Sequence, residues 1–183
     1  MSRGNRSAFK TRLEWLWPCL WALSIFATSS GVVTIGRLSH AVATATDGHV
    51  AESQFRIGWE AIWWIVVKGW HAAEFAILYL LCRRARPNRP WPPIAIAALL
   101  AISDELHQLF VPYRGCRASD VCIDWLGIVT AWAFASGYLA KLKHRPIMLA
   151  IVTVAWFGTL FVLSEFPFGH LSIDKPESPS LAP

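Results

Sequence analysis

Residues 60–82 read EAIWWIVVKGWHAAEFAILYLLC, and this stretch decides the fold class because it is apolar over a length that crosses a membrane. A helix of about 20 apolar residues spans a hydrocarbon layer of roughly 30 Å. Four further apolar stretches of this kind lie at residues 14–35, 92–112, 119–140 and 146–166. The sequence therefore predicts an all-α, polytopic membrane bundle with about five transmembrane helices.

The overall composition agrees with a membrane protein. Hydrophobic residues make up 55% of the 183 residues and charged residues only 16%, which is too apolar for a soluble domain. The apolar stretches do not alternate with polar residues, as the strands of a membrane barrel would. The net charge of +5 is explained by membrane topology, and no nucleic-acid partner is expected.

The basic residues predict how the chain is oriented. Most of the 17 lysines and arginines lie before residue 13, at 83–89 and at 141–145, which are on one side of a five-helix bundle. Because basic residues favour the cytoplasmic side, the N-terminus is expected in the cytoplasm and the C-terminus outside it. Residues 1–12 are then a cytoplasmic N-terminus, and residues 13–166 form a single helical membrane domain. Residues 167–183 are expected to form a disordered extracytoplasmic tail.

The first predicted helix has two interpretations. A basic start, an apolar stretch and the small residues ATSSG at 27–31 are also features of a cleaved signal, which would leave four helices. The apolar run from Leu13 to Gly36 is longer than the usual signal core, which favours a retained helix. Residues 37–59, rich in Ala, Thr and Ser, are expected to form an external loop before the second helix.

Polar residues form a stripe inside each of three predicted helices, although a charged side chain costs about 2.5–3.5 kcal/mol to insert at the bilayer centre. Spacings of three and four residues place the members of a stripe on one face of a helix. The stripes are Lys68, His71 and Glu74 in the second helix, Asp104, His107 and Gln108 in the third with Glu105 at its margin, and Asp120, Asp124 and Gly127 in the fourth. With a rise of about 1.5 Å per residue, the stripes come together in the outer half of the membrane. Arg114 and Arg117, in the following loop, are expected to lie over this cluster.

The segments KGWHAAEFAILYLL at 68–81, SDELHQLFVPYRGCRASD at 103–120 and DWLG at 124–127 resemble the VanZ-like family of small bacterial membrane proteins. That family is named for a protein linked to teicoplanin resistance. The resemblance covers residues 63 to about 135, the expected VanZ-like core, and implies a location in the bacterial cytoplasmic membrane and a role in the envelope. It points to functional positions at Lys68, His71, Asp104, Glu105, Gln108, Pro112, Arg114, Asp120 and Gly127.

The cluster favours an intramembrane acid–base hydrolase or transferase that acts on a lipid or lipid-linked envelope component. The candidate catalytic residues are Asp104, Glu105, His107 and His71, because carboxylates and imidazoles transfer protons. The candidate substrate-binding residues are Lys68, Gln108, Arg114, Arg117, Asp120 and Asp124, with the arginines suited to a phosphate or carboxylate headgroup. Membrane lipids and a lipid-linked envelope substrate are the expected partners.

Other functions fit parts of the cluster. A non-catalytic protein that binds an envelope ligand or an antibiotic would need the arginines but no acid–base pair. A proton-coupled carrier would need polar groups through the whole membrane, and here they stop near its middle. Carboxylate–histidine pairs three residues apart also suit metal ions, but Lys68 would repel a cation, so neither a metal ion nor another cofactor is expected.

The four cysteines show no paired metal-binding spacing. Cys116 and Cys122 are expected on the oxidising side of the membrane, and the sequence leaves open whether they form a disulfide. Ser103 and Cys116 are candidate nucleophiles, although neither lies in a nucleophile motif.

Overall fold

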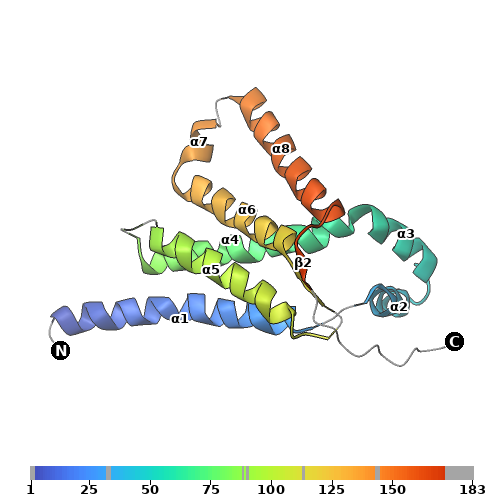
Figure 1. Cartoon of the computed structure of the whole chain (residues 1–183), viewed down its shortest axis with the longest axis horizontal. Coiled ribbons are helices and arrows are strands. Elements are labelled where there is room, and N and C mark those ends of the chain that lie inside the picture. The colour runs from blue at the N-terminus through green and yellow to red at the C-terminus, as the bar shows by residue number, and fades with distance from the viewer. Residues whose placement is uncertain are drawn as a thin grey trace.

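The computed structural model describes residues 3–31, 34–87, 89, 91–112, 114–142 and 145–171, and these residues are predominantly helical (Figure 1). The helices are α1 (Arg3–Ser29), α2 (Ile35–Ala45), α3 (Glu52–Trp63), the π-helix η1 (Trp64–Lys68), α4 (Gly69–Ala85), α5 (Trp91–Gln108), α6 (Ala118–Ala135), α7 (Tyr138–Leu142) and α8 (Pro146–Glu165). Two short strands, β1 (Cys116–Arg117) and β2 (His170–Leu171), pair with each other. The predicted helical fold class is confirmed.

Three helices in the described part of the chain are long and apolar enough to cross a membrane. They are the continuous helix Glu52–Ala85, which joins α3, η1 and α4, and the helices α6 and α8. Two further long helices, α1 and α5, coincide with the other predicted stretches. Length and apolar composition therefore identify three candidate spans in the described residues, and the expected count of about five is not confirmed.

The helix α4 lies at the centre of the bundle, in contact with α1, α5 and α6 (Figure 1). The core consists of Phe75, Leu78, Tyr79 and Cys82 of α4, Ile25 of α1, Ala97 and Ala101 of α5, and Ile128 and Ala131 of α6. In a bilayer, such packing is favoured by van der Waals contact rather than by escape from water. The first predicted helix is thus part of the bundle core.

The helices α4 and α6 approach closely at Gly127, which lies against the backbone of Ala72. A Cβ atom on residue 127 would overlap the Ala72 carbonyl group. Small residues allow helix backbones in membranes to come this close. The contact brings the polar stripes of the second and fourth predicted helices face to face.

The polar stripe of the second predicted helix begins in a π-helical turn. Such turns are rare, occur mostly as single bulges in α-helices, and are frequent at functional sites. Trp64, at the start of η1, packs edge-on against Phe161 of α8, with ring centroids 5.2 Å apart. Lys68, the last residue of η1, is buried and bonded to α6. The π-turn is therefore held by α8 at its start and by α6 at its end.

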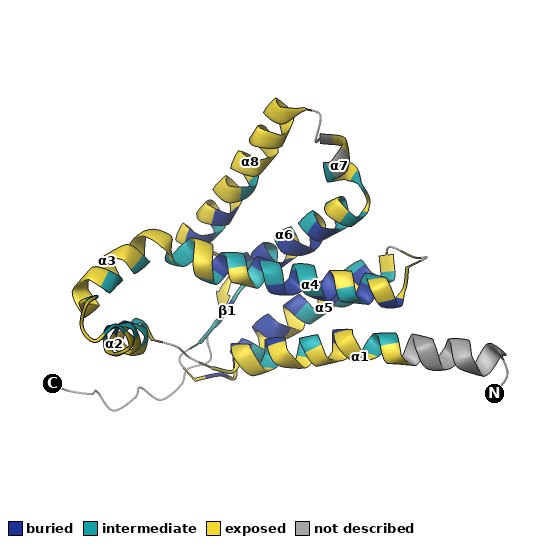
Figure 2. Ribbon diagram, turned by 180° about the vertical axis from the view of Figure 1, so that it is seen from behind, coloured by how far each residue is buried: buried dark blue, intermediate teal, exposed yellow. Residues whose placement is uncertain are grey.

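The expected loop at residues 37–59 is mostly helical. The helix α2 begins after Thr34, whose hydroxyl oxygen accepts a hydrogen bond from the Arg37 backbone N–H at 3.3 Å. A turn follows in which Asp47 and Gly48 have φ angles of 49° and 78°. Alanine favours helix, but the segment lacks the long apolar run that signalled the other helices. Both α2 and α3 are largely exposed (Figure 2).

The prediction of a disordered tail is wrong for residues 167–171, because they fold back onto the start of α6. The Gly169 carbonyl accepts a hydrogen bond from the Ala118 N–H at 3.3 Å, and the Phe168 carbonyl accepts one from the Ser119 N–H at 3.4 Å. N–H groups in the first turn of a helix have no partner within that helix. The returning segment supplies these partners, which composition alone did not reveal. The rest of the predicted tail, residues 172–183, lies outside the described residues.

Candidate functional site

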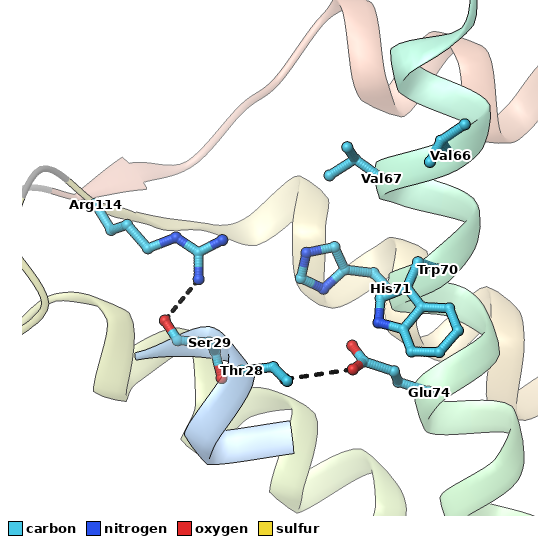
Figure 3. A pocket seen from close by; sticks show the side chains of 8 residues that line it. All are labelled: Thr28, Ser29, Val66, Val67, Trp70, His71, Glu74 and Arg114. Carbon is cyan, nitrogen blue, oxygen red and sulfur yellow. Dashed lines mark hydrogen bonds between the residues drawn. The ribbon is translucent and has the colours of Figure 1, made fainter. Parts of the chain in front are cut away.

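A cavity of about 300 Å³ lies beside the C-terminal end of α1 (Figure 3). It is lined by Thr28 and Ser29 of α1, Val66 and Val67 of η1, Trp70, His71 and Glu74 of α4, and Arg114 of the loop after α5. Among the predicted site residues, His71 and Arg114 line this cavity. The wall is apolar at Val66, Val67 and the Trp70 ring and polar at His71, Glu74 and Arg114, which suits a ligand with both kinds of surface.

Arg114 is fixed at the cavity wall by the end of α1. Its Nη1 donates a hydrogen bond to the Ser29 carbonyl oxygen at 2.6 Å (Figure 3). Carbonyl groups at a helix C-terminus lack partners within the helix and carry partial negative charge, so they favour a cation. The end of α1 therefore holds a guanidinium at the edge of the cavity.

Glu74 is a buried carboxylate on the opposite side of the cavity (Figure 3). Its Oε1 accepts a hydrogen bond from the Thr28 hydroxyl at 3.4 Å. Its backbone carbonyl accepts a second bond from the Trp21 indole N–H at 2.9 Å. Two residues of α1 thus hold the turn of α4 that carries this acid.

His71 connects the cavity to a carboxylate buried behind it. Its Nδ1 lies 3.8 Å from Oδ1 of Asp124, and the Asp124 side chain is completely buried. Neither carboxylate oxygen of Asp124 has a hydrogen-bond partner among the described residues. The predicted stripes of the second and fourth helices therefore meet, with the imidazole between the cavity and the acid.

Lys68 and Asp120 form the shortest ion pair of the cluster. The lysine Nζ donates to both carboxylate oxygens of Asp120 at 2.8 Å, and both residues are less than 9% exposed. Mutual attraction and hydrogen bonding offset part of the cost of removing both charges from water. Neither residue lines the cavity, so the pair joins η1 to α6 behind it.

Asp104 and Gln108 belong to a network with α1 rather than to the cavity. The Ser29 hydroxyl donates to Oδ1 of Asp104 at 2.5 Å, and the Gln108 amide donates to Oδ2 at 3.0 Å. Asp104 is 1% exposed. The two predicted site residues thus fix the end of α1 against α5, and their contact with the cavity is indirect, through Ser29.

Glu105 points toward β1, on a different side of α5. Its Oε2 accepts a hydrogen bond from the Arg117 backbone N–H at 2.9 Å. Its Oε1 has no hydrogen-bond partner in the described part of the chain, although the residue is only 1% exposed. Arg117 therefore meets the cluster through its backbone, whereas Arg114 is the arginine that lines the cavity.

His107 lies apart from the other predicted catalytic residues. Its Nε2 is 2.9 Å from the Ser30 hydroxyl, and its ring packs edge-on against Phe26 at 5.5 Å between centroids. The described residues contain no hydrogen bond from His107 to Asp104 or Glu105. The stripe of α5 thus divides among three different partners.

Comparison with known families agrees with this arrangement of polar residues in apolar helices. The family model described as VanZ/LLP1 matches residues 14–141. The chain belongs to the VanZ-like family. The match is wider than the core at 63–135 expected from the motifs, and includes every residue that lines the cavity. Comparisons with curated proteins and with solved structures gave no match.

One part of this VanZ-like site that sequence reasoning missed comes from the end of α1, to which the sequence assigned no site residue. Thr28, Ser29 and Ser30 bond to Glu74, Asp104 and His107, respectively. Their signal in the sequence is the run of hydroxyl residues that closes an apolar helix. That run was considered only as a feature of a cleaved signal.

The cysteines of the VanZ-like chain are all free thiols. Burial raises the pKa of the Cys116 thiol, and the neighbouring carboxylates of Glu105 and Asp120 raise it further. A raised pKa leaves less of the reactive thiolate, which argues against Cys116 as a nucleophile at neutral pH. Among the described residues, no three His, Cys, Asp or Glu side chains are grouped so as to hold a metal ion.

Proposed function

We propose that this VanZ-like protein is an intramembrane acid–base enzyme, a hydrolase or transferase, that acts on a lipid or lipid-linked component of the bacterial envelope. One observation carries the proposal: His71 lines the cavity and has the buried carboxylate of Asp124 behind it. A carboxylate behind an imidazole orients the ring and stabilises its protonated form. The separation of 3.8 Å is longer than a hydrogen bond, as is common for catalytic pairs without substrate.

The shape of the cavity supports a substrate that stays partly in the membrane. Val66 and Trp70 are 45% and 54% exposed beside the polar wall formed by His71, Glu74 and Arg114. Exposed apolar side chains on a membrane helix face lipid, so the cavity is open to the bilayer along this side. A lipid could place its headgroup at the polar wall while its chains remain among other lipids.

We further propose that the protein has five spans in the cytoplasmic membrane, with a retained first helix and the cavity in the outer half. The helices α1, α4, α5, α6 and α8 run in alternating directions (Figure 1). The start of α1 and the α4–α5 connection lie at one end of the bundle, and both are rich in basic residues. This arrangement supports a cytoplasmic N-terminus and an extracytoplasmic C-terminus.

Alkaline phosphatase fusions test the topology, because this reporter is active only outside the cytoplasm. Fusions after residues 50 and 171 are expected to be active, and a fusion after residue 89 is expected to be inactive. A fluorescent protein that folds only in the cytoplasm should give the opposite pattern. Activity after residue 89 would contradict the proposed orientation, and inactivity after residue 171 would contradict the odd number of spans.

Replacing His71 with Gln is expected to lower turnover by about 10²–10⁴-fold, because positioned proton transfer contributes a factor of this size. The measurement is a mass-spectrometric comparison of envelope lipids and wall precursors. Cells would carry no copy, the wild-type protein or the His71→Gln variant at matched expression. A molecule that changes with the wild type but not with the variant identifies the substrate class.

His107→Gln is the matched control, since this histidine bonds Ser30 outside the cavity. The control is expected to give the wild-type lipid profile. Identical profiles with no copy, wild type and variant would contradict the enzyme proposal.

A second candidate function is a protein that binds an envelope ligand or a glycopeptide antibiotic without reaction. The observation that favours it is Arg114, which α1 holds at the cavity wall in a position to meet an anionic group. In this case His71→Gln should leave any teicoplanin resistance unchanged, while Arg114→Gln should abolish it. If the protein confers resistance as an enzyme instead, both His71→Gln and Arg114→Gln should abolish it.

A further inference from the structure

The cavity carries opposite charges on facing walls. Arg114 is held by the Ser29 carbonyl, and Glu74 is held by the hydroxyl of the preceding residue, Thr28 (Figure 3). Because Thr28 and Ser29 are consecutive, the guanidinium and the carboxylate border one small space of about 300 Å³. A ligand that fills this space meets both groups.

Glu74 has no basic side chain as an ion-pair partner among the described residues. It is 6% exposed, and the groups that donate to its carboxylate are neutral: the Thr28 hydroxyl, at 3.4 Å, and the Trp70 indole. A buried carboxylate is costly unless a donor or a cation satisfies it. The cavity in front of Glu74 therefore favours a ligand that brings a positive charge.

Trp70 adds a second element of a cation site. Its ring lies beside the Glu74 side chain at the cavity and is 54% exposed (Figure 3). Tryptophan is the aromatic residue that attracts ammonium groups most strongly. A carboxylate next to an indole is thus suited to a primary amine more than to a neutral hydroxyl group.

We propose that the ligand of this cavity is a phospholipid whose headgroup carries an amine, as in phosphoethanolamine. The phosphate binds Arg114 and His71, the ammonium binds Glu74 and Trp70, and the chains leave past Val66. This inference rests on the proposed function and specifies its substrate class. It excludes purely anionic headgroups as the preferred ligands.

The test compares three lipids by native mass spectrometry of the full-length protein in detergent. Phosphatidylethanolamine has a phosphate and an amine. Its N-acetylated form keeps the phosphate but loses the positive charge, and phosphatidylglycerol keeps the phosphate but has hydroxyl groups in place of the amine. Wild-type protein is expected to bind the amine lipid about tenfold or more tightly than the other two, as for a hydrogen bond to a charged group. This comparison needs no variant and so does not depend on the folding of one.

Glu74→Gln is expected to remove the preference while leaving the binding of phosphatidylglycerol unchanged. Glu60→Gln removes one exposed carboxylate from α3 and should keep the preference. Equal wild-type affinity for all three lipids would overturn the inference but leave a lipid substrate in place. If the wild-type protein binds none of the three lipids, the result would contradict the proposed function as well.

Discussion

Replacing Lys68 with Met is expected to lower the free energy of unfolding by about 3–5 kcal/mol, the cost of breaking a buried ion pair from one side. Methionine has a similar volume but cannot donate to Asp120, which would keep only the long bond from the Ser119 hydroxyl to Oδ1, at 3.5 Å, in place of the two lysine bonds at 2.8 Å. Asp120 is 8% exposed, so water cannot readily replace the lost donor. Reversible unfolding in mixed detergent micelles measures the change.

The double variant Lys68→Met with Asp120→Leu separates the ion pair from the packing around it. Removing both charges at once leaves no unpaired carboxylate, and such replacements are often neutral or stabilising. We therefore expect the double variant to recover most of the lost stability. If it is as unstable as the single variant, the lysine chain rather than its charge supports the fold.

Replacing Gly127 with Ala is expected to destabilise the protein by about 3 kcal/mol, near the upper end for an overpacked site. The added Cβ would overlap the Ala72 carbonyl, a backbone group that cannot rotate away. The two helices must then separate, which weakens Lys68–Asp120 and His71–Asp124 together. Loss of stability and loss of activity should therefore appear in the same variant.

Gly158→Ala provides the matched control. Gly158 lies in α8, and a Cβ at this position meets no atom within 4 Å. This control is expected to keep both the stability and the activity of the wild type. Equal behaviour of the two glycine variants would show that the close contact of α4 and α6 is not needed.

The spacing of polar residues within apolar helices predicted the centre of the site. Lys68 and His71 share a face of one helix, and Asp120 and Asp124 share a face of another. Their depths along antiparallel helices required the two faces to meet, as the contacts Lys68–Asp120 and His71–Asp124 show. The helical period and the cost of burying charge were sufficient to predict this contact, because both helices carry charges that a membrane excludes.

The contribution of α1 was not predictable in this way. The Ser29 hydroxyl donates to Asp104, but it also lies within bonding distance of the Ile25 carbonyl one turn earlier, at 2.6 Å. Serine and threonine near a helix end routinely form such local bonds. A hydroxyl with a distant partner therefore looks the same in the sequence as one without.

The division of the α5 stripe also depends on neighbours that the sequence does not specify. Successive residues of a helix point about 100° apart, so Asp104 and Glu105 face different elements. Asp104 meets a side chain of α1, whereas Glu105 meets the backbone N–H of Arg117. A backbone donor has no signature in the sequence, and the arginine was therefore assigned to the cluster through its charge.

The pairing of β2 with β1 has a consequence for the order in which the protein assembles. The first turn of α6 emerges from the ribosome long before Phe168 and Gly169, whose carbonyl groups accept hydrogen bonds from its N–H groups. Until α8 has been synthesised and inserted, the N–H groups of Ala118 and Ser119 lack these partners. The same turn carries Asp120, the partner of Lys68. The end of the site beside β1 is thus completed last, after α8 has been synthesised.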